Sequence, residues 1–160
     1  MSPVGRAEGA RVTSTADELE AIRQLKARYC RYLDTRDVEG WRGIFAPDLT
    51  VLLDGAVSTG GADPQTGPPI EGVDNFVPMV LGTLEGVATV HHCHTPEITL
   101  TSPTTATGIW AMEDLLFFPD GNRLHGAGHY REIYEKRDGQ WLITSLHLTR
   151  TLLRFSGAAE

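Results

Sequence analysis

The chain has 160 residues, 41% hydrophobic and 22% charged, which is enough for one domain with a substantial core. Its net charge of -7 and its lack of a Lys/Arg cluster argue against a nucleic-acid-binding surface. No apolar run reaches the ~18 residues of a membrane span, and the start lacks the apolar segment of a signal peptide. Cys30 and Cys93, with no CxxC spacing, fit small packing residues in a reduced, cytoplasmic protein.

The N-terminal third predicts a tail and a long helix. Residues 1–13 are rich in Gly, Ala and Arg and are expected to be disordered, so the domain is expected to cover 14–156. Thr15 and Glu18 fit a capping box, with Thr15 as the N-cap. The helix continues to about Asp34, and its apolar residues repeat every three or four positions, which indicates one buried face.

Shorter elements follow this helix. In order, they are a short helix capped by Asp37 and ended by Pro47-Asp48, a strand at 49–53, a Gly/Pro-rich loop at 54–69, and a helix at 71–84. Pro78 falls inside the last of these, so it either occupies the first turn or kinks the helix.

The second half predicts an antiparallel sheet. Strand character is found at 87–94, 97–101, 105–118, 123–137 and 140–155. Pro119-Asp120-Gly121-Asn122 and Asp138-Gly139 are strong hairpin turns, and Ser102-Pro103-Thr104 is a third turn. Strands this long are expected to curl around the helices, so the fold class is α+β: a cone with an internal cavity.

Three polar residues fall on otherwise apolar rows of these elements. Tyr29 lies on the apolar stripe of the long helix, Asp114 shares strand parity with Trp110 and Met112, and Arg150 shares it with Leu142, Leu146, Leu148 and Leu152. A charge that faces an apolar interior costs several kcal/mol unless it is paired. The pattern therefore indicates either a structural ion pair or an active site. His91 adds an imidazole, and the four groups together are the equipment of an acid–base catalyst.

Longer motifs resemble a known family. The stretches LKARYCRYLD, HCHTPEITLTSPTTATGIWAMEDLLFFPDG and HYREIYEKRDGQWLITSLHLTR are similar to the SnoaL-like branch of the nuclear-transport-factor-2 (NTF2) superfamily, over roughly residues 18–155. Within this superfamily the chain most resembles the bile acid 7α-dehydratases, relatives of the scytalone dehydratases. The resemblance implies an NTF2-like (SnoaL-like, cystatin-like) cone with helices packed in a curved sheet around a deep pocket.

The same resemblance implies a carbon–oxygen lyase without metal or cofactor. The dehydratases' catalytic tyrosine, histidine, aspartate and arginine fall on Tyr29, His91, Asp114 and Arg150. The implied reaction removes water from a hydroxylated, carbonyl-activated, steroid-like or polycyclic substrate, which could carry coenzyme A. The resemblance also favours a homo-oligomer, a trimer over a dimer, with neither nucleic acid nor membrane as a partner.

Each residue can be given a role in a dehydration. His91 can remove an acidified C–H proton and return it to the leaving hydroxyl, and Asp114 can hold one ring nitrogen of His91. Tyr29 can donate to the carbonyl or to the departing hydroxyl. Arg150 can fix an anionic group, or it can pair with Asp114 and keep it ionised. His94, Trp110, Met112, Tyr32 and His129 are the expected substrate-binding residues, although His129 can equally face solvent.

Other interpretations of the same residues stay open. Asp114 and Arg150 can form a purely structural pair. The clustered His91, His92 and His94 suggest a metal site, but no Glu or Cys partner with ligand spacing is evident. Glycines at 60–61 and 126–128 lack a phosphate-binding pattern. The alternative functions are a ketosteroid-type isomerase or polyketide cyclase on the same fold, or a non-catalytic protein that binds a hydrophobic ligand.

Overall fold

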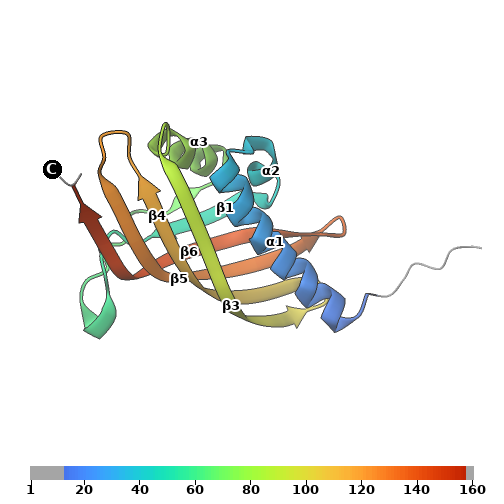
Figure 1. Ribbon diagram of the computed structural model, residues 1–160. Coiled ribbons are helices and arrows are strands. Elements are labelled where there is room, and N and C mark those ends of the chain that lie inside the picture. The colour runs from blue at the N-terminus through green and yellow to red at the C-terminus, as the bar shows by residue number, and fades with distance from the viewer. Residues whose placement is uncertain (1–12, 158–160) are drawn as a thin grey trace, which may run out of the picture.

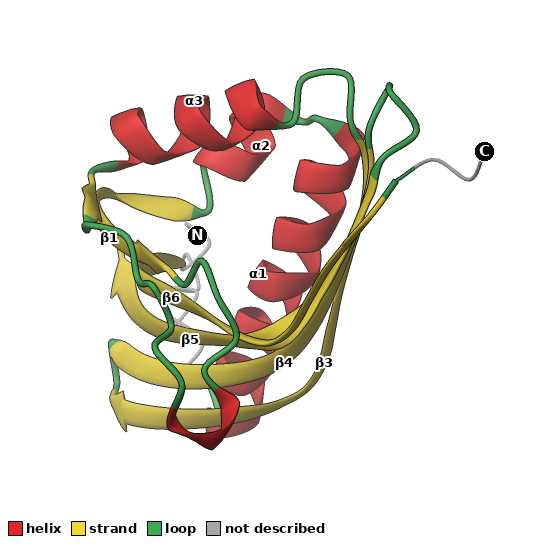
Figure 2. Ribbon diagram, turned by 90° about the vertical axis from the view of Figure 1, so that its left-hand side faces the viewer, coloured by secondary structure: helices red, strands yellow, loops and turns green. Residues whose placement is uncertain are grey.

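The computed structural model describes residues 13–157 as a curved six-stranded sheet with helices on its concave side (Figures 1 and 2). The helices are α1 (Thr15–Thr35), α2 (Val38–Arg42) and α3 (Val73–Thr83), with a 3₁₀ turn, η1 (Thr59–Gly61). The strands are β1 (Phe45–Leu53), β2 (Ile70–Glu71), β3 (Ala88–Ser102), β4 (Thr105–Phe117), β5 (Arg123–Arg137) and β6 (Gln140–Ser156). The predicted α+β cone is confirmed. The expected disordered tail lies outside the described residues, apart from Thr13.

The sheet has the order β2-β1-β6-β5-β4-β3, and only the β1–β6 pair is parallel. The predicted Asp138-Gly139 hairpin is confirmed, because both residues have the positive φ (49° and 81°) that a two-residue type I′ turn requires. The strands from β3 to β6 bend together, and α1 crosses their concave face while α3 lies over one end (Figure 2).

The long helix begins one residue earlier than predicted. Ser14 is the N-cap: its hydroxyl accepts from the N–H of Asp17 (3.2 Å), and its own N–H donates to the Asp17 carboxylate (3.0 Å). The predicted Thr15–Glu18 capping box is therefore wrong. Glu18 instead points toward the sheet, where it accepts from Lys136 Nζ (2.7 Å) and Trp141 Nε1 (2.6 Å).

Two other boundaries differ from the prediction, and the structure also places Pro78. The first strand begins at Phe45, which pairs with Ile143, so the chain leaves α2 earlier than expected. The third strand runs unbroken from Ala88 to Ser102 and absorbs the predicted gap as a register irregularity after His94. Pro78 lies inside α3, beyond its first turn, and is exposed.

The parity of the last strand changes along its length. Against β5, β6 carries one extra residue at Thr144 and one at Thr151, and each bulge moves the following side chains to the other face. Ile143, which is fully buried, therefore faces the interior in place of the predicted Leu142. Leu146 and Leu148 are buried as expected, and they share an unbroken segment of β6 with Arg150.

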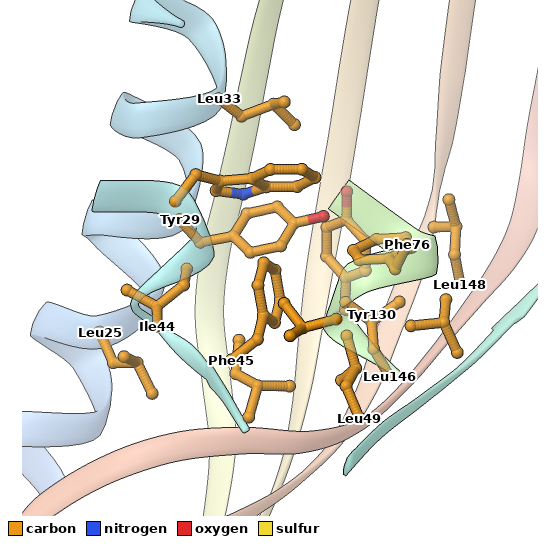
Figure 3. Close-up of a cluster of buried hydrophobic side chains, with 14 of the residues drawn as sticks. Leu25, Tyr29, Leu33, Ile44, Phe45, Leu49, Phe76, Tyr130, Leu146 and Leu148 are labelled. Atoms are coloured by element: carbon orange, nitrogen blue, oxygen red, sulfur yellow. The ribbon is translucent and has the colours of Figure 1, made fainter. Parts of the chain in front are cut away.

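An aromatic cluster joins the helices to the sheet (Figure 3). Tyr29 on α1 packs edge-on against Trp41 on α2 and Phe45 on β1, with ring centroids 5.7 and 5.9 Å apart. Phe76 on α3 completes the cluster at 5.5 Å from both Trp41 and Phe45. Contacts of this geometry add to the burial of the rings themselves, so they fix α1 and α3 relative to one another.

Candidate active site

A cavity of about 250 Å³ lies between α1, α3 and the sheet. Its walls are mostly aliphatic and aromatic, and are formed by Leu33, Leu53, Phe76, Met79, Val80, Leu84, Leu116, Leu146 and Leu148. Besides Thr83, its polar groups are Tyr29, His91, Asp114 and Tyr130. Few polar groups in an otherwise apolar enclosure are typical of a small-molecule site.

The imidazole of His91 is held by a carboxylate from α1. His91 Nδ1 lies 2.6 Å from Asp34 Oδ1, and the backbone N–H of His91 donates to Asp34 Oδ2 (2.9 Å). This double contact fixes both the position and the ring orientation of the histidine. Within residues 13–157, Nε2 of His91 makes no hydrogen bond, so it is the nitrogen that can exchange a proton with a molecule in the cavity.

Asp34 owes its position to the way α1 ends. Arg36 closes the helix in the left-handed conformation (φ 58°) and donates to carbonyl groups of Leu33 and Leu84. Arg36 also donates to Thr89 Oγ1 (3.1 Å), which in turn donates to Asp34 Oδ1 (2.9 Å). The last turn of α1 is thereby tied to the start of β3, where His91 lies.

The carboxylate of Asp34 is maintained in its charged form. Burial is the largest single effect and raises its pKa, but hydrogen bonds from the ring and the backbone of His91 outweigh it, so the pKa lies below the ordinary value for aspartate. Asp34 is therefore ionised at neutral pH. A fixed negative charge at Nδ1 favours the imidazolium that forms when Nε2 accepts a proton.

Two tyrosines also line the cavity. The rings of Tyr29 and Tyr130 meet edge-on with centroids 5.4 Å apart, and the hydroxyl of Tyr29 points toward Tyr130 (Figure 3). Burial raises the pKa of both phenols well above the ordinary value. Both hydroxyls therefore keep their protons at neutral pH and can donate hydrogen bonds to an oxygen on which negative charge develops.

A buried ion pair packs against the rings of both tyrosines. The Nζ atom of Lys26 lies 3.8 Å from the ring centroid of Tyr29 and 3.6 Å from that of Tyr130. Lys26 is paired with Glu132, and both side chains are fully buried. Glu132 also accepts from the hydroxyl of Tyr134. These contacts restrict the motion of both tyrosine rings.

Asp114 has a different partner from the one predicted. It lines the cavity, but Arg150 holds its two oxygens in a bidentate pair (2.8 Å each), so the expected contact between Asp114 and the His91 ring is wrong. The alternative pairing of Arg150 with Asp114 is confirmed. Gly126 makes room for this pair, since a Cβ there would overlap both side chains. Arg150 itself lies behind Asp114 rather than in the cavity wall.

None of the five predicted substrate-binding residues lines this cavity. His94 and Trp110 border a second groove of about 390 Å³, between α1 and β3, which His91 also lines. Tyr32 faces a depression of about 540 Å³ that runs along α1 and reaches α2. Met112 is buried behind the Asp114–Arg150 pair, where its sulphur lies 3.8 Å from Arg150 Nη1. His129 alternates with the buried Tyr130 and so faces away from the interior.

The larger depression is less suited to acid–base chemistry. It is lined by neither His91 nor Asp114, and the carboxylate of its Glu18 is taken up by Lys136 and Trp141. Of the three clustered histidines, His91 is buried, whereas His92 and His94 are exposed. Within residues 13–157 no three His, Cys, Asp or Glu side chains are arranged to hold a metal ion.

The sequence interpretation missed Asp34 and Tyr130. The sequence patterns place Asp34 only at the end of a helix, but it stands in the last turn of α1, where the helix dipole disfavours an anion and where no basic residue compensates it. That electrostatic mismatch was the available signal for a functional carboxylate. Tyr130 shares strand parity with Glu132 and Tyr134, and all three are buried. A buried row of polar residues was the corresponding signal on β5.

Comparisons with known proteins agree with this fold. The family model of the SnoaL-like domain matches residues 14–147. The protein named Probable cyclase FGR4, of Gibberella zeae, is 26% identical over 139 residues, which cover 81% of this chain and 88% of that protein.

Two solved structures are also similar. A protein of unknown function from Mycobacterium tuberculosis, Rv3472, shares 28% identity with a TM-score of 0.67, and the match covers 83% of this chain and 71% of that one. The hexachlorocyclohexane dehydrochlorinase LinA-type3 from Novosphingobium barchaimii has a TM-score of 0.73 over 91% of this chain and 94% of its own, but at 16% identity it shows the fold alone. Since the family model spans most of the chain, this protein belongs to the SnoaL-like domain family.

Proposed function

We propose that the protein is a cofactor-independent lyase that removes water from a hydroxylated substrate next to a carbonyl group. His91 takes the proton from the carbon beside the carbonyl through Nε2, and Asp34 stabilises the resulting imidazolium. The tyrosine pair donates to the carbonyl oxygen while it carries the negative charge. The hydroxyl on the next carbon then leaves with the proton of the imidazolium, which gives an unsaturated carbonyl compound and water.

One observation carries this proposal: a buried histidine with one nitrogen fixed by a carboxylate, in an apolar cavity that also contains two protonated phenols. A protein that only binds a hydrophobic ligand has no need of an ionised Asp34 in an unfavourable helix position. The dehydrochlorinase with the same fold is named for an elimination reaction. Elimination from adjacent carbons needs a base in the same kind of enclosure, which supports a lyase here.

The lining and volume of the cavity limit which part of a substrate can enter it. Its walls are aliphatic and aromatic, which suits the steroid-like or polycyclic class. Its volume of about 250 Å³ falls just below the roughly 300 Å³ at which small-molecule pockets usually begin. We therefore propose that one or two rings of the substrate occupy the cavity and that any further ring, or a coenzyme A group, stays outside it.

A cyclase or isomerase is the second candidate. The protein from Gibberella zeae is named a cyclase, and its match covers most of both chains. Cyclisation and double-bond migration begin with the same proton abstraction beside a carbonyl, so His91, Asp34 and the tyrosines would keep their roles. The two outcomes differ in the product, because only dehydration releases water.

The test is a screen of hydroxylated ketones and thioesters of one to four rings by thermal shift, followed by product analysis of each compound that stabilises the protein. We expect a product lighter by one water from the wild type, and about 10²–10⁴-fold lower turnover from folded His91→Ala. A product of unchanged mass would favour the isomerase or cyclase. Wild-type turnover in folded His91→Ala would remove the histidine from the mechanism and overturn the proposal.

A further inference from the structure

The two cysteines of the chain meet across the α1–β3 interface. Cys30 and Cys93 are 63 positions apart in the sequence, yet their Sγ atoms lie 3.5 Å apart. Both are free thiols and both are partly exposed. A disulfide needs its sulphurs about 2.05 Å apart, so a shift of about 1.5 Å would bring this pair to bonding distance.

This thiol pair connects the same two elements as the Asp34–His91 contact. Cys30 precedes Asp34 by one helical turn, so the two side chains lie on the same face of α1. Cys93 follows His91 by two strand residues, so these two lie on the same face of β3. Four helical residues advance about 6.0 Å and two strand residues advance about 6.8 Å. Because these two distances are similar, the Cys30–Cys93 and Asp34–His91 contacts lie next to each other along the α1–β3 interface.

The surroundings of the pair suit oxidation of one particular cysteine. Cys30 and Cys93 both line the 390 Å³ groove, which small oxidants can enter from solvent. The adjacent Cys93 thiol lowers the pKa of Cys30. Burial opposes this lowering, and the Lys26 ammonium reinforces it. The same contact and burial raise the pKa of Cys93. Cys30 is therefore the better nucleophile, and Cys93 is the neighbour that can resolve its oxidised form.

We propose that Cys30 and Cys93 form a reversible disulfide that changes the Asp34–His91 geometry and thereby switches the candidate active site. With hydrogen peroxide as the oxidant, the Cys30 sulphur attacks one peroxide oxygen, which gives a sulfenic acid and one water. The Cys93 sulphur then attacks the Cys30 sulphur and displaces the second water, so two thiols and one peroxide become one disulfide and two waters. A dithiol reductant returns both thiols by exchange.

The disulfide pulls the last turns of α1 toward β3 at a point adjacent to the dyad. Because Asp34 and His91 are in contact at 2.6 Å, a displacement of this size changes their hydrogen bond. Oxidation is thus expected to lower turnover and reduction to restore it. Only this consequence for turnover rests on the proposed function; disulfide formation and its effect on the His91 ring do not.

The first experiment measures the bond itself, without any substrate. Native protein is treated with hydrogen peroxide, the remaining thiols are alkylated, and intact and peptide masses are recorded. We expect the loss of two hydrogens, a cross-linked peptide containing Cys30 and Cys93, and full reversal by dithiothreitol. Folded Cys30→Ser and Cys93→Ser variants serve as matched controls and should not lose two hydrogens. Oxygen addition without a cross-link, or a cross-link between two chains, would overturn the proposal.

The second experiment measures the coupling to the dyad. The ring nitrogens of His91 are observed by NMR in the reduced and in the fully oxidised wild type, and in Cys30→Ser under both conditions. We expect the His91 signals to move on oxidation of the wild type and to stay unchanged in Cys30→Ser. Unchanged signals in a fully cross-linked wild type would show a disulfide that does not act on the site, and would overturn the switch.

Discussion

Two aspartates beside His91 have different kinds of partner. Asp34, from the last turn of α1, holds the titratable ring of His91 at 2.6 Å. Asp114, from β4, is held by the permanently charged guanidinium of Arg150 through two bonds of 2.8 Å. Both carboxylates approach the interior, but only the first is joined to a ring whose second nitrogen is free to exchange a proton with a bound molecule.

The two pairs therefore differ in role: the Asp34–His91 pair can take part in a reaction, and the Asp114–Arg150 pair maintains the structure. A carboxylate–guanidinium pair keeps its charges and its geometry during a reaction, with Asp114 in the cavity wall and Arg150 behind it. A carboxylate–imidazole pair leaves the second ring nitrogen available. Substitutions at the two aspartates should therefore affect different measurements.

The largest expected effect concerns Asp34→Asn and turnover. The amide keeps the shape of the side chain but removes the charge that stabilises the imidazolium, and it can bind the wrong tautomer of His91. We expect turnover of an identified substrate to fall by about 10²–10⁴-fold, measured by steady-state kinetics.

The matched control for Asp34→Asn is Asp48→Asn, which removes an exposed carboxylate paired with Arg137. Surface ion pairs contribute little, so its turnover and stability should remain close to wild type. A folded Asp34→Asn protein with wild-type turnover would remove the contrast between the two aspartates.

The next prediction concerns Asp114→Asn and the free energy of unfolding. Removing one partner leaves Arg150 charged and largely buried, which should lower that free energy by about 3 kcal/mol in urea unfolding. Asp114→Leu combined with Arg150→Met removes both charges and should recover most of the loss. Equal destabilisation by the single and the double variant would show that the ion pair is not the source of the effect.

A smaller effect is expected from Gly126→Ala, which alters the same pair without replacing either member. A methyl group on Gly126 would overlap the carboxylate of Asp114 and the guanidinium of Arg150. We expect the unfolding free energy to fall by about 1–3 kcal/mol, in thermal or urea unfolding. Gly82→Ala is the control, since a Cβ there meets nothing within 4 Å. An unaffected Gly126→Ala protein would mean that the pair tolerates displacement.

Sequence patterns predicted the cone and most of its elements because burial has a period that can be read from the chain. The stripe of α1 and the hairpin at Asp138-Gly139 are examples. The same patterns could not predict the two bulges of β6, since an extra residue at Thr144 or Thr151 leaves no mark in composition. The parity read from Arg150 back along β6 is therefore wrong for the residues before the Thr144 bulge: Trp141 and Ile143 are buried in the structure.

The candidate site was predicted in part for a related reason. Helix and strand rows correctly suggested that Tyr29 and Asp114 approach one cavity, and the family resemblance added His91. They could not assign partners, because pairing depends on the three-dimensional distance between elements. Asp34 was absent from the α1 stripe since it lies five positions after Tyr29, just past the residue that continues the stripe. Only the packing of α1 on β3 brings it to His91.

The smallest expected effect concerns a third carboxylate, Glu18, which serves neither pair and binds across the far end of α1. Hydrogen bonds from Lys136, Thr13 and Trp141 lower its pKa from 4.5 to about 2, although burial opposes them. A pKa that is lower in the folded state means that the ionised group stabilises the protein above pH 4.5, and that this contribution is lost as the pH falls from 4.5 toward 2. Glu18→Gln lacks this contribution at every pH. Its Tm should therefore lie below the wild-type Tm at pH 7, and the two should converge in acid. The acid loss from Asp34, whose pKa is also lowered, occurs in both proteins and cancels in the difference. Glu20→Gln, an exposed change on the same helix, is the control and should follow the wild type throughout. Parallel curves of Tm against pH for Glu18→Gln and the wild type would contradict the role of the ionised Glu18 in fixing α1 to the sheet.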